Sequence, residues 1–178
     1  AGRLSDAKKR SKEIAEDENS TPESLFSAAS ASFRVLESQG SEPDRAEYSE
    51  IIRIVKKGVE RQHGAPEIKK RAALSVNARV ILGLCYEHLE DTPNAKRAFQ
   101  QALALSPNNE VALISLGIHN YDKNTKEAIK YFEKAIKRNA TTVWPYLYVA
   151  HYALINRNYS KAASHCLMGL SLPKKPVS

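Results

Sequence analysis

Histidine and cysteine are the residues of this 178-residue chain most suited to metal binding or nucleophilic chemistry. No histidine pairs with another ligand at a metal-binding spacing such as H-x-x-x-H, and no C-x-x-C is present. The histidines are His63, His88, His119, His151 and His165. The sequence therefore predicts no metal site.

Cys85 and His88 are the residues that come nearest to a catalytic pair, because they stand three positions apart on an expected helix. No third residue is apparent that would orient the histidine. Gly-rich loops that could hold a phosphate are also absent, since the seven glycines are scattered. We therefore predict no catalytic residue and no cofactor, and a protein that is not an enzyme.

The sequence predicts that every element able to position a site is a helix. Three helices are expected in the first 75 residues, over 5–18, 21–40 and 43–63, and apolar residues recur at helical spacing in the second and third. We expect the second and third to form a degenerate helix pair packed on the rest of the chain, and the charged first helix to pack weakly. Ala65-Pro66 then opens a run from Glu67 to Leu89 that we predict as one long helix.

A 34-residue pattern over residues 76–109 identifies the architecture. The residues that define the pattern are Leu82-Gly83, Tyr86, Ala95, Phe99, Ala102 and Pro107. This pattern resembles the tetratricopeptide repeat (TPR), a helix–turn–helix unit with L-G-x-x-Y, then A-x-x-x-F, then P. One such unit cannot bury its own apolar face. The resemblance therefore implies an all-α, helical-repeat solenoid of stacked antiparallel helix pairs.

Two further units follow in phase with the first. In residues 110–142, Leu116-Gly117 match directly, whereas Ala128, Phe132 and Ala135 match after one deletion in the turn near residues 122–125. In residues 143–172 the match is weaker, with Cys166 and Gly169 in place of Phe and Ala. The predicted organisation is thus N-terminal helices (1–75), three TPR units (76–109, 110–142 and 143–172) and a tail (173–178).

The resemblance also predicts a concave surface lined by the first helix of each unit. In unit order, its partner-binding positions are Asn77, Val80, Leu84 and His88; Val111, Ile114, Ile118 and Tyr121; and Trp144, Leu147, His151 and Leu154. This surface is mostly apolar, which favours a helical or extended apolar segment of another protein as the ligand. Aromatic anchors would be Trp144, Tyr121 and Tyr148. The alternatives are that the surface is filled by the N-terminal helices or by a second copy.

The best-known groove of the family binds acidic chaperone tails through basic and amide side chains. The corresponding positions here hold Val80, Leu84, Ser115, Trp144 and Tyr148. None of these residues is basic, so the resemblance does not extend to the binding of chaperone C-terminal tails.

Positive charge is concentrated in the second half of the chain. Of the formal net charge of +7, residues 76–178 contribute +6, with 13 basic and seven acidic residues. A basic ridge follows the second helix of the middle unit and consists of Lys126, Lys130, Lys134, Lys137 and Arg138. A solvated face is the favoured interpretation, and a contact with nucleic acid or an anionic surface is the alternative.

No apolar run approaches the ~20 residues that span a bilayer, and no secretory signal is visible. We expect Cys85 and Cys166, two units apart, to be reduced core residues. Reduced cysteines favour an intracellular, cytoplasmic protein. At the end of the third unit, Met168, Leu170 and Leu172 are candidates for contact with further chain or a second subunit.

Overall fold

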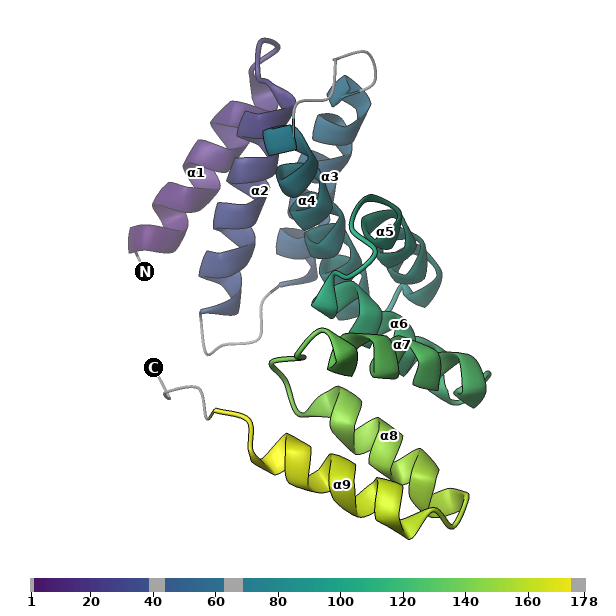
Figure 1. Ribbon diagram of the computed structural model, residues 1–178. Coiled ribbons are helices and arrows are strands. Elements are labelled where there is room, and N and C mark those ends of the chain that lie inside the picture. Colours follow the sequence, from purple (N-terminus) through teal and green to yellow (C-terminus); the bar gives the residue numbers. More distant parts are fainter. Residues whose placement is uncertain (1, 39–43, 63–68, 174–178) are drawn as a thin grey trace. The chain divides into compact units, whose positions relative to one another are not determined.

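The computed structural model describes residues 2–38, 44–62 and 69–173. Within these ranges the chain forms nine helices and no strand. They are α1 (Gly2–Glu16), α2 (Pro22–Glu37), α3 (Arg45–Gln62), α4 (Lys69–His88), α5 (Thr92–Leu105), α6 (Glu110–Tyr121), α7 (Thr125–Lys137), α8 (Trp144–Ile155) and α9 (Tyr159–Leu170) (Figure 1).

Consecutive helices pack as antiparallel pairs: α2 with α3, α4 with α5, α6 with α7, and α8 with α9 (Figure 1). These pairs confirm the predicted all-α helical-repeat fold. The chain divides into two compact units, unit 1 (Ala1–Ser106) and unit 2 (Pro107–Ser178). In unit 1, α4 packs against both α2 and α3, and in unit 2, α7 packs against α8.

Short polar side chains start most of these helices, because they accept hydrogen bonds from amides that have no partner within the helix. Thr21 caps α2, and Asn124 caps α7 while also bonding the Glu127 side chain. Asp91 caps α5, because its carboxylate accepts from the Asn94 amide. The sequence Thr92-Pro93 suggests Thr92 as this cap, but Thr92 is the first residue of the helix.

A glycine that faces an aromatic ring holds the helices of several pairs close together. A Cβ built on Gly83 would lie 2.5 Å from the Phe99 ring, and one on Gly117 would lie 2.5 Å from the Phe132 ring. Both phenylalanines are fully buried. The spacing of Gly and Phe in the repeat is therefore a packing requirement, since any side chain at the glycine would displace the ring.

The one-residue deletion in the second unit lies in the turn between α6 and α7. In the other two turns a residue with positive φ, Glu90 or Arg157, precedes the helix cap. There the amide of the cap bonds a carbonyl five residues earlier, as in Asn158 to Ala153. Between α6 and α7 the amide of Asn124 instead bonds the carbonyl of Asn120, four residues earlier. The turn is tightened and both helices are kept, as the deletion predicted.

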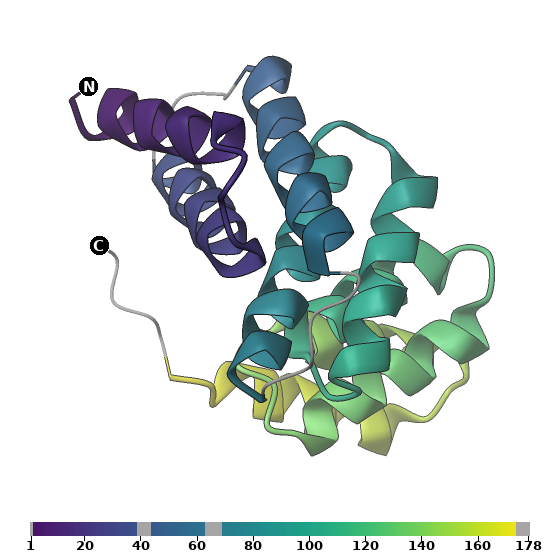
Figure 2. The same cartoon turned by 90° about the horizontal axis from the view of Figure 1, so that it is seen from above.

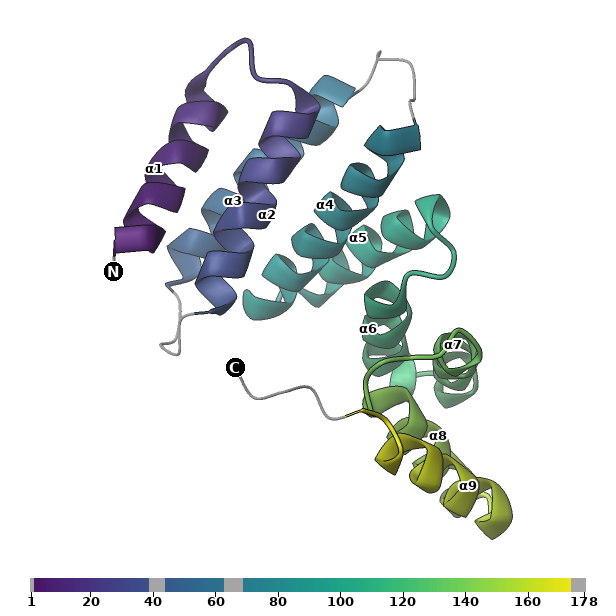
Figure 3. The same cartoon turned by 60° about the vertical axis from the view of Figure 1, so that its left-hand side comes forward.

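The expectation that the first helix packs weakly is wrong. α1 lies beside α2 (Figure 2), and its Ala15 and Ser11 are buried. The Ser11 hydroxyl contacts the Ser32 hydroxyl of α2 at 2.6 Å. Small residues on both helices permit this approach, and a search for large apolar residues does not reveal it. α2 and α3 in turn lie between α1 and α4 (Figure 3).

The run predicted as one long helix is one helix, α4, over its described part. Several sequence-based expectations fall outside the described residues. They concern Gly40, Pro43, His63, Gly64, Ala65-Pro66 and Glu67.

Candidate interaction surface

Unit 2 exposes most of the apolar residues that the sequence places on the concave surface. They come from α6 and α8, the first helices of two successive pairs, and are between 41 and 55% exposed. We call this set the α6/α8 face: Val111, Ile118, Trp144, Leu147 and Leu154. Ile114 differs, because the structure places it in the core at 8% exposure.

α8 explains why the face is so apolar. Its twelve residues include no Asp, Glu, Lys or Arg. One side of the helix buries Pro145, Tyr146 and Val149 against its neighbours, and the other side leaves Trp144, Leu147 and Leu154 exposed. A helix that is apolar all round is normally covered on every side. The exposed side of α8 is therefore suited to a binding partner.

An aromatic cluster closes one end of the α6/α8 face. The Tyr121 ring lies edge-on to the Tyr148 ring at 4.8 Å, and Tyr148 stacks on Phe132 at 4.6 Å. The Tyr121 hydroxyl lies 2.6 Å from Nδ1 of His151. Two residues that the sequence assigns to the same surface, Tyr121 and His151, are thus in contact.

Burial, and then the nearby Tyr148 and Asp122, raise the pKa of the Tyr121 hydroxyl, so it stays protonated. Because His151 is exposed, the otherwise apolar surface carries an imidazole beside the aromatic cluster.

The two apolar residues among the predicted concave positions of unit 1 are covered wholly or in part. Val80 is buried and Leu84 is half-buried, since α2 and α3 pack on α4. Asn77 is exposed. His88 stacks on Tyr48 of α3 with ring centroids 4.3 Å apart. Unit 1 therefore offers no equivalent of the α6/α8 face among these residues.

His88 takes part in a polar cluster that joins three helices. Its Nε2 lies 3.2 Å from a Glu37 carboxylate oxygen, and the Tyr48 hydroxyl donates to the same oxygen at 3.4 Å. Burial and the Glu37 carboxylate raise the pKa of Tyr48 to about 12. Glu37 belongs to α2 and Tyr48 to α3, so the cluster holds both against the end of α4.

The two cysteines have different environments. Cys85 is fully buried, and this burial raises the pKa of its thiol to about 12, so it does not form the thiolate that a nucleophile requires. The structure thus gives no support to a Cys85–His88 catalytic pair. Cys166 is only half-buried, which corrects the prediction that both are core residues. Both thiols are free.

The basic ridge lies on the outer face of α7, with every one of its five side chains exposed. Lys126, Lys130 and Lys134 line a shallow depression of about 430 Å³ together with Asn124, Glu127 and Tyr131. Lys174 and Lys175 of the tail lie outside the described residues. The ridge is therefore a mainly positive surface that includes the Glu127 carboxylate and has one aromatic ring beside it.

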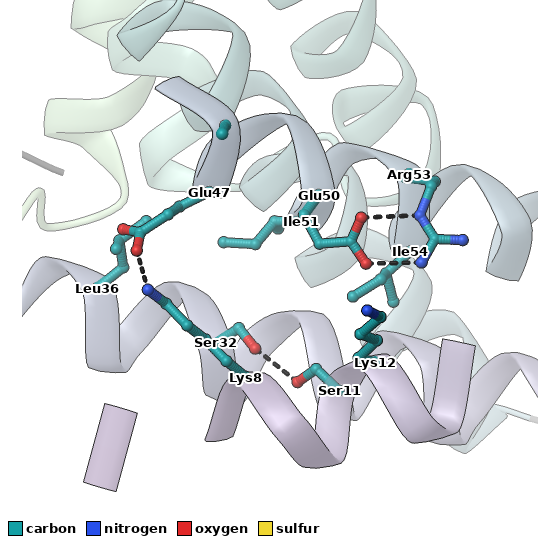
Figure 4. Close-up of a pocket in the computed structure, with 11 residues that line it drawn as sticks. Lys8, Ser11, Lys12, Ser32, Leu36, Glu47, Glu50, Ile51, Arg53 and Ile54 are labelled. Carbon is teal, nitrogen blue, oxygen red and sulfur yellow. Dashed lines mark hydrogen bonds and ion pairs between the residues drawn. The ribbon is translucent and has the colours of Figure 1, made fainter. Parts of the chain in front are cut away.

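A cavity of about 370 Å³ in unit 1 lies between α1 and α3 (Figure 4). Leu36, Ile51 and Ile54 supply its apolar part. Of its charged groups, Lys12 lies 3.9 Å from Glu16, and Lys8 pairs with Glu47. Arg53 donates two hydrogen bonds to Glu50, of 2.6 and 2.8 Å. Because these groups are already paired, the cavity serves the packing of α1 better than the binding of a ligand.

Across residues 2–38, 44–62 and 69–173, no three His, Cys, Asp or Glu side chains are grouped to hold a metal ion. In the same part of the chain, no helix combines the length and apolar character needed to cross a membrane.

A second exposed apolar surface lies on α9, and sequence reasoning indicated only part of it, through Met168 and Leu170. Tyr159, Leu167 and Leu170 are between 66 and 79% exposed. The available indication was Leu167, which stands where the first two units have the polar residues Gln100 and Glu133.

Comparison with known proteins agrees with this architecture. Tetratricopeptide repeat family models match residues 76–109 and 118–142. The crystal structure of MamA aligns with 90% of this chain and 82% of its own, with a TM-score of 0.65 and 18% sequence identity, a likeness of fold. Among curated proteins, none matches significantly. The repeat pattern, the paired helices and these matches together identify tetratricopeptide repeats at residues 76–109 and 118–142 of this chain.

Proposed function

We propose that this protein is a non-catalytic protein–protein interaction scaffold that binds a helical or extended apolar segment on the α6/α8 face. Its repeats belong to a family that generally mediates protein interactions. The observation that carries the proposal is the exposure of Val111, Ile118, Trp144, Leu147 and Leu154 on two adjacent first helices. Exposed apolar patches of this kind typically mark interaction sites.

The chemistry of the face describes the segment it would accept. Apolar side chains at helical or alternating spacing would cover Ile118 and Leu147, and Trp144 would act as an anchor because its ring is 55% exposed. The exposed imidazole of His151 would offer the segment a polar contact beside the aromatic cluster. Chaperone tails are disfavoured, since no basic side chain stands at the clamp positions and two of them, Val80 and Ser115, are buried.

The test is a selection of binding peptides followed by titration against matched variants. We expect Ile118→Glu to weaken the selected peptide at least about tenfold, because a charge would enter the apolar contact. Leu105→Glu on α5 is the control, since Leu105 is also about 40% exposed but lies in unit 1. Equal weakening by both variants, or by neither, would contradict the proposal.

Trp144→Ala separates binding from packing. Because more than half of the Trp144 side chain is exposed, we expect the affinity to fall while the melting temperature changes little. Unchanged affinity together with a clear loss of stability would make Trp144 a core residue. A selection that returns only this chain's own sequence would instead indicate self-association through the face.

The alternative function is binding of nucleic acid or an anionic surface through the basic ridge. The observation in its favour is the depression that three ridge lysines share with Tyr131. Such binding would weaken steeply with salt, and Lys130→Ala with Lys134→Ala would reduce the salt dependence. Affinity for single-stranded RNA that does not change between low and physiological salt would count against it.

Two free cysteines also lead us to propose an intracellular site of action.

A further inference from the structure

We propose that Asp122 pairs with a basic residue of the bound segment, so that the α6/α8 face selects an apolar segment carrying a lysine or arginine. This inference rests on the function proposed above and adds to it the charge that the partner must carry. It depends on the position of Asp122, on its lack of a bonding partner and on the electrostatics of a helix end.

Asp122 lies on the same side of α6 as the exposed apolar residues of the face. Successive residues of a helix are about 100° apart, so Val111, Ile118 and Asp122 fall within about 40° of arc. All three are exposed. Asp122 directly follows the last residue of α6 and keeps helical backbone angles, so the same direction extends to it. A segment that covers Ile118 therefore comes within about 6 Å, one helical turn, of Asp122 along the helix axis.

The two helices of the face supply no other exposed charge of this kind. Within α6 the only Asp, Glu, Lys or Arg is Glu110, and α8 has none. Glu110 is half-buried and accepts hydrogen bonds from the amide and the hydroxyl of Thr141, at 2.6 and 3.1 Å. Asp122 is therefore the carboxylate on this face that a partner can reach.

Asp122 differs from the other carboxylates of unit 2 in having no bonding partner. Glu127 accepts from Asn124 at 3.1 Å, and Glu133 accepts from Lys161 at 2.7 Å. Asp122 forms no hydrogen bond or ion pair with any residue in the described part of the chain. Unit 2 has ten Lys and Arg residues but only four Asp and Glu residues. A carboxylate that stays unpaired despite this excess is available to a basic group of another molecule.

The end of a helix is an unfavourable place for a carboxylate, because the last backbone carbonyls give it a partial negative charge. Asp122 stands at this end of α6. The equivalent position of α4 holds His88, which faces the Glu37 carboxylate at 3.2 Å, and that of α8 holds Ile155. Asp122 therefore does not stabilise its own helix, whereas a cation from a partner would be attracted by the carboxylate and the helix end together.

The surroundings of Asp122 also favour a basic side chain. Tyr121 precedes it, and the Tyr121 side chain contacts the Tyr148 ring and His151. The Asp122 carboxylate is close enough to Tyr121 to contribute to the raised pKa of its hydroxyl. Cations bind over aromatic rings, and a guanidinium also stacks on them. A lysine or arginine paired with Asp122 therefore has an aromatic surface beside it.

The test is a pair of selections from a random peptide library, one on the natural full chain and one on the Asp122→Lys chain. We expect the natural chain to select Lys or Arg at a fixed distance from the apolar anchors, and Asp122→Lys to select Asp or Glu there. For a basic peptide selected by the natural chain, Asp122→Asn should weaken binding about two- to fivefold. Charge reversal by Asp122→Lys should weaken it at least about tenfold.

Lys123→Ala is the matched control, because Lys123 is the exposed neighbour of Asp122 with the opposite charge. It should not weaken the same peptide. The melting temperature separates binding from folding. Asp122→Asn removes a negative charge from the negative end of α6, so we expect it to keep or raise the melting temperature while the affinity falls.

Three outcomes would overturn the inference. Peptides that lose affinity with Ile118→Glu but show no basic preference, and bind Asp122→Lys equally well, would leave the proposed function standing without a role for Asp122. A preference for acidic peptides that Lys123→Ala abolishes would assign the selection to the basic residues. Peptides whose binding Ile118→Glu does not change, or a library that yields no binder, would contradict the proposed function and this inference with it.

Discussion

Unit 1 and unit 2 are built from the same helix pairs but treat their apolar surfaces differently. Among the described residues, every strongly exposed large apolar side chain except Leu105 belongs to unit 2. In unit 1, α2 and α3 cover α4, and the cluster of Glu37, Tyr48 and His88 joins the three helices. In unit 2, the first helices keep one side open.

This difference lies at positions that the repeat pattern does not specify, and these are the positions available for binding a partner. The pattern requires Gly83 and Phe99 in unit 1 and Gly117 and Phe132 in unit 2, and both pairs pack in the same way. The positions between them are unconstrained by that packing. Unit 1 uses them to bury α4, whereas unit 2 exposes Ile118 and Leu147 at the same kind of position.

The largest expected effect tests whether both cores are equally tight. Phe99→Ala and Phe132→Ala each remove a fully buried ring that fills the space over a glycine. We expect each to lower the free energy of unfolding by about 3–5 kcal/mol. Chemical denaturation measures the loss, and hydrogen exchange should place it in α4–α5 for Phe99 and in α6–α7 for Phe132.

A much smaller loss of unfolding free energy for Phe132→Ala than for Phe99→Ala would contradict the comparison of the two units. It would mean that unit 2 is loosely packed, and that its exposed apolar residues reflect poor packing instead of a binding surface. Equal costs would sharpen the comparison, because the two units would then differ at their surfaces alone.

The repeat pattern made the fold predictable to an unusual degree. Gly83, Phe99 and Pro107 each have a steric reason for their positions, so the helix pairs and the shortened turn could be read from the sequence. The packing of α1 could not, since it depends on small residues such as Ser11 and Ser32 that carry no apolar pattern. Surface positions were less predictable than packed ones, because Val80 and Ile114 share a repeat face with exposed residues yet are buried by neighbouring side chains.

An intermediate effect is expected in the labelling of the two cysteines. Cys85 in unit 1 is fully buried and its thiol pKa is raised to about 12, whereas Cys166 in unit 2 is half-buried. A thiol-specific reagent should therefore modify Cys166 in the folded protein on the order of 100-fold faster, since Cys85 reacts after local opening. Cys166→Ser leaves Cys85 alone for a separate rate.

Similar labelling rates would show that unit 1 opens as readily as unit 2 exposes its thiol. Burial of α4 would then be transient, and the contrast between a closed and an open unit would not describe the protein in solution. Denaturant added below the unfolding transition should accelerate Cys85 and change Cys166 little.

The smallest expected effect concerns the interactions that hold α2 and α3 against α4 in unit 1. Glu37→Gln removes the carboxylate that faces His88 at 3.2 Å and accepts from Tyr48, but the side chains of both Glu37 and His88 are more than 40% exposed. Exposed ion pairs contribute about 0–1 kcal/mol, so we expect a loss within that range, measured by denaturation. Glu50→Gln, which breaks the exposed Arg53 pair within α3, is the control. A loss of stability above about 2 kcal/mol would show that the carboxylate is what holds α2 and α3 against α4. A small loss would show that packing holds these helices together, because the Tyr48 ring stacked on His88 and the buried Ile51 and Val80 remain in place.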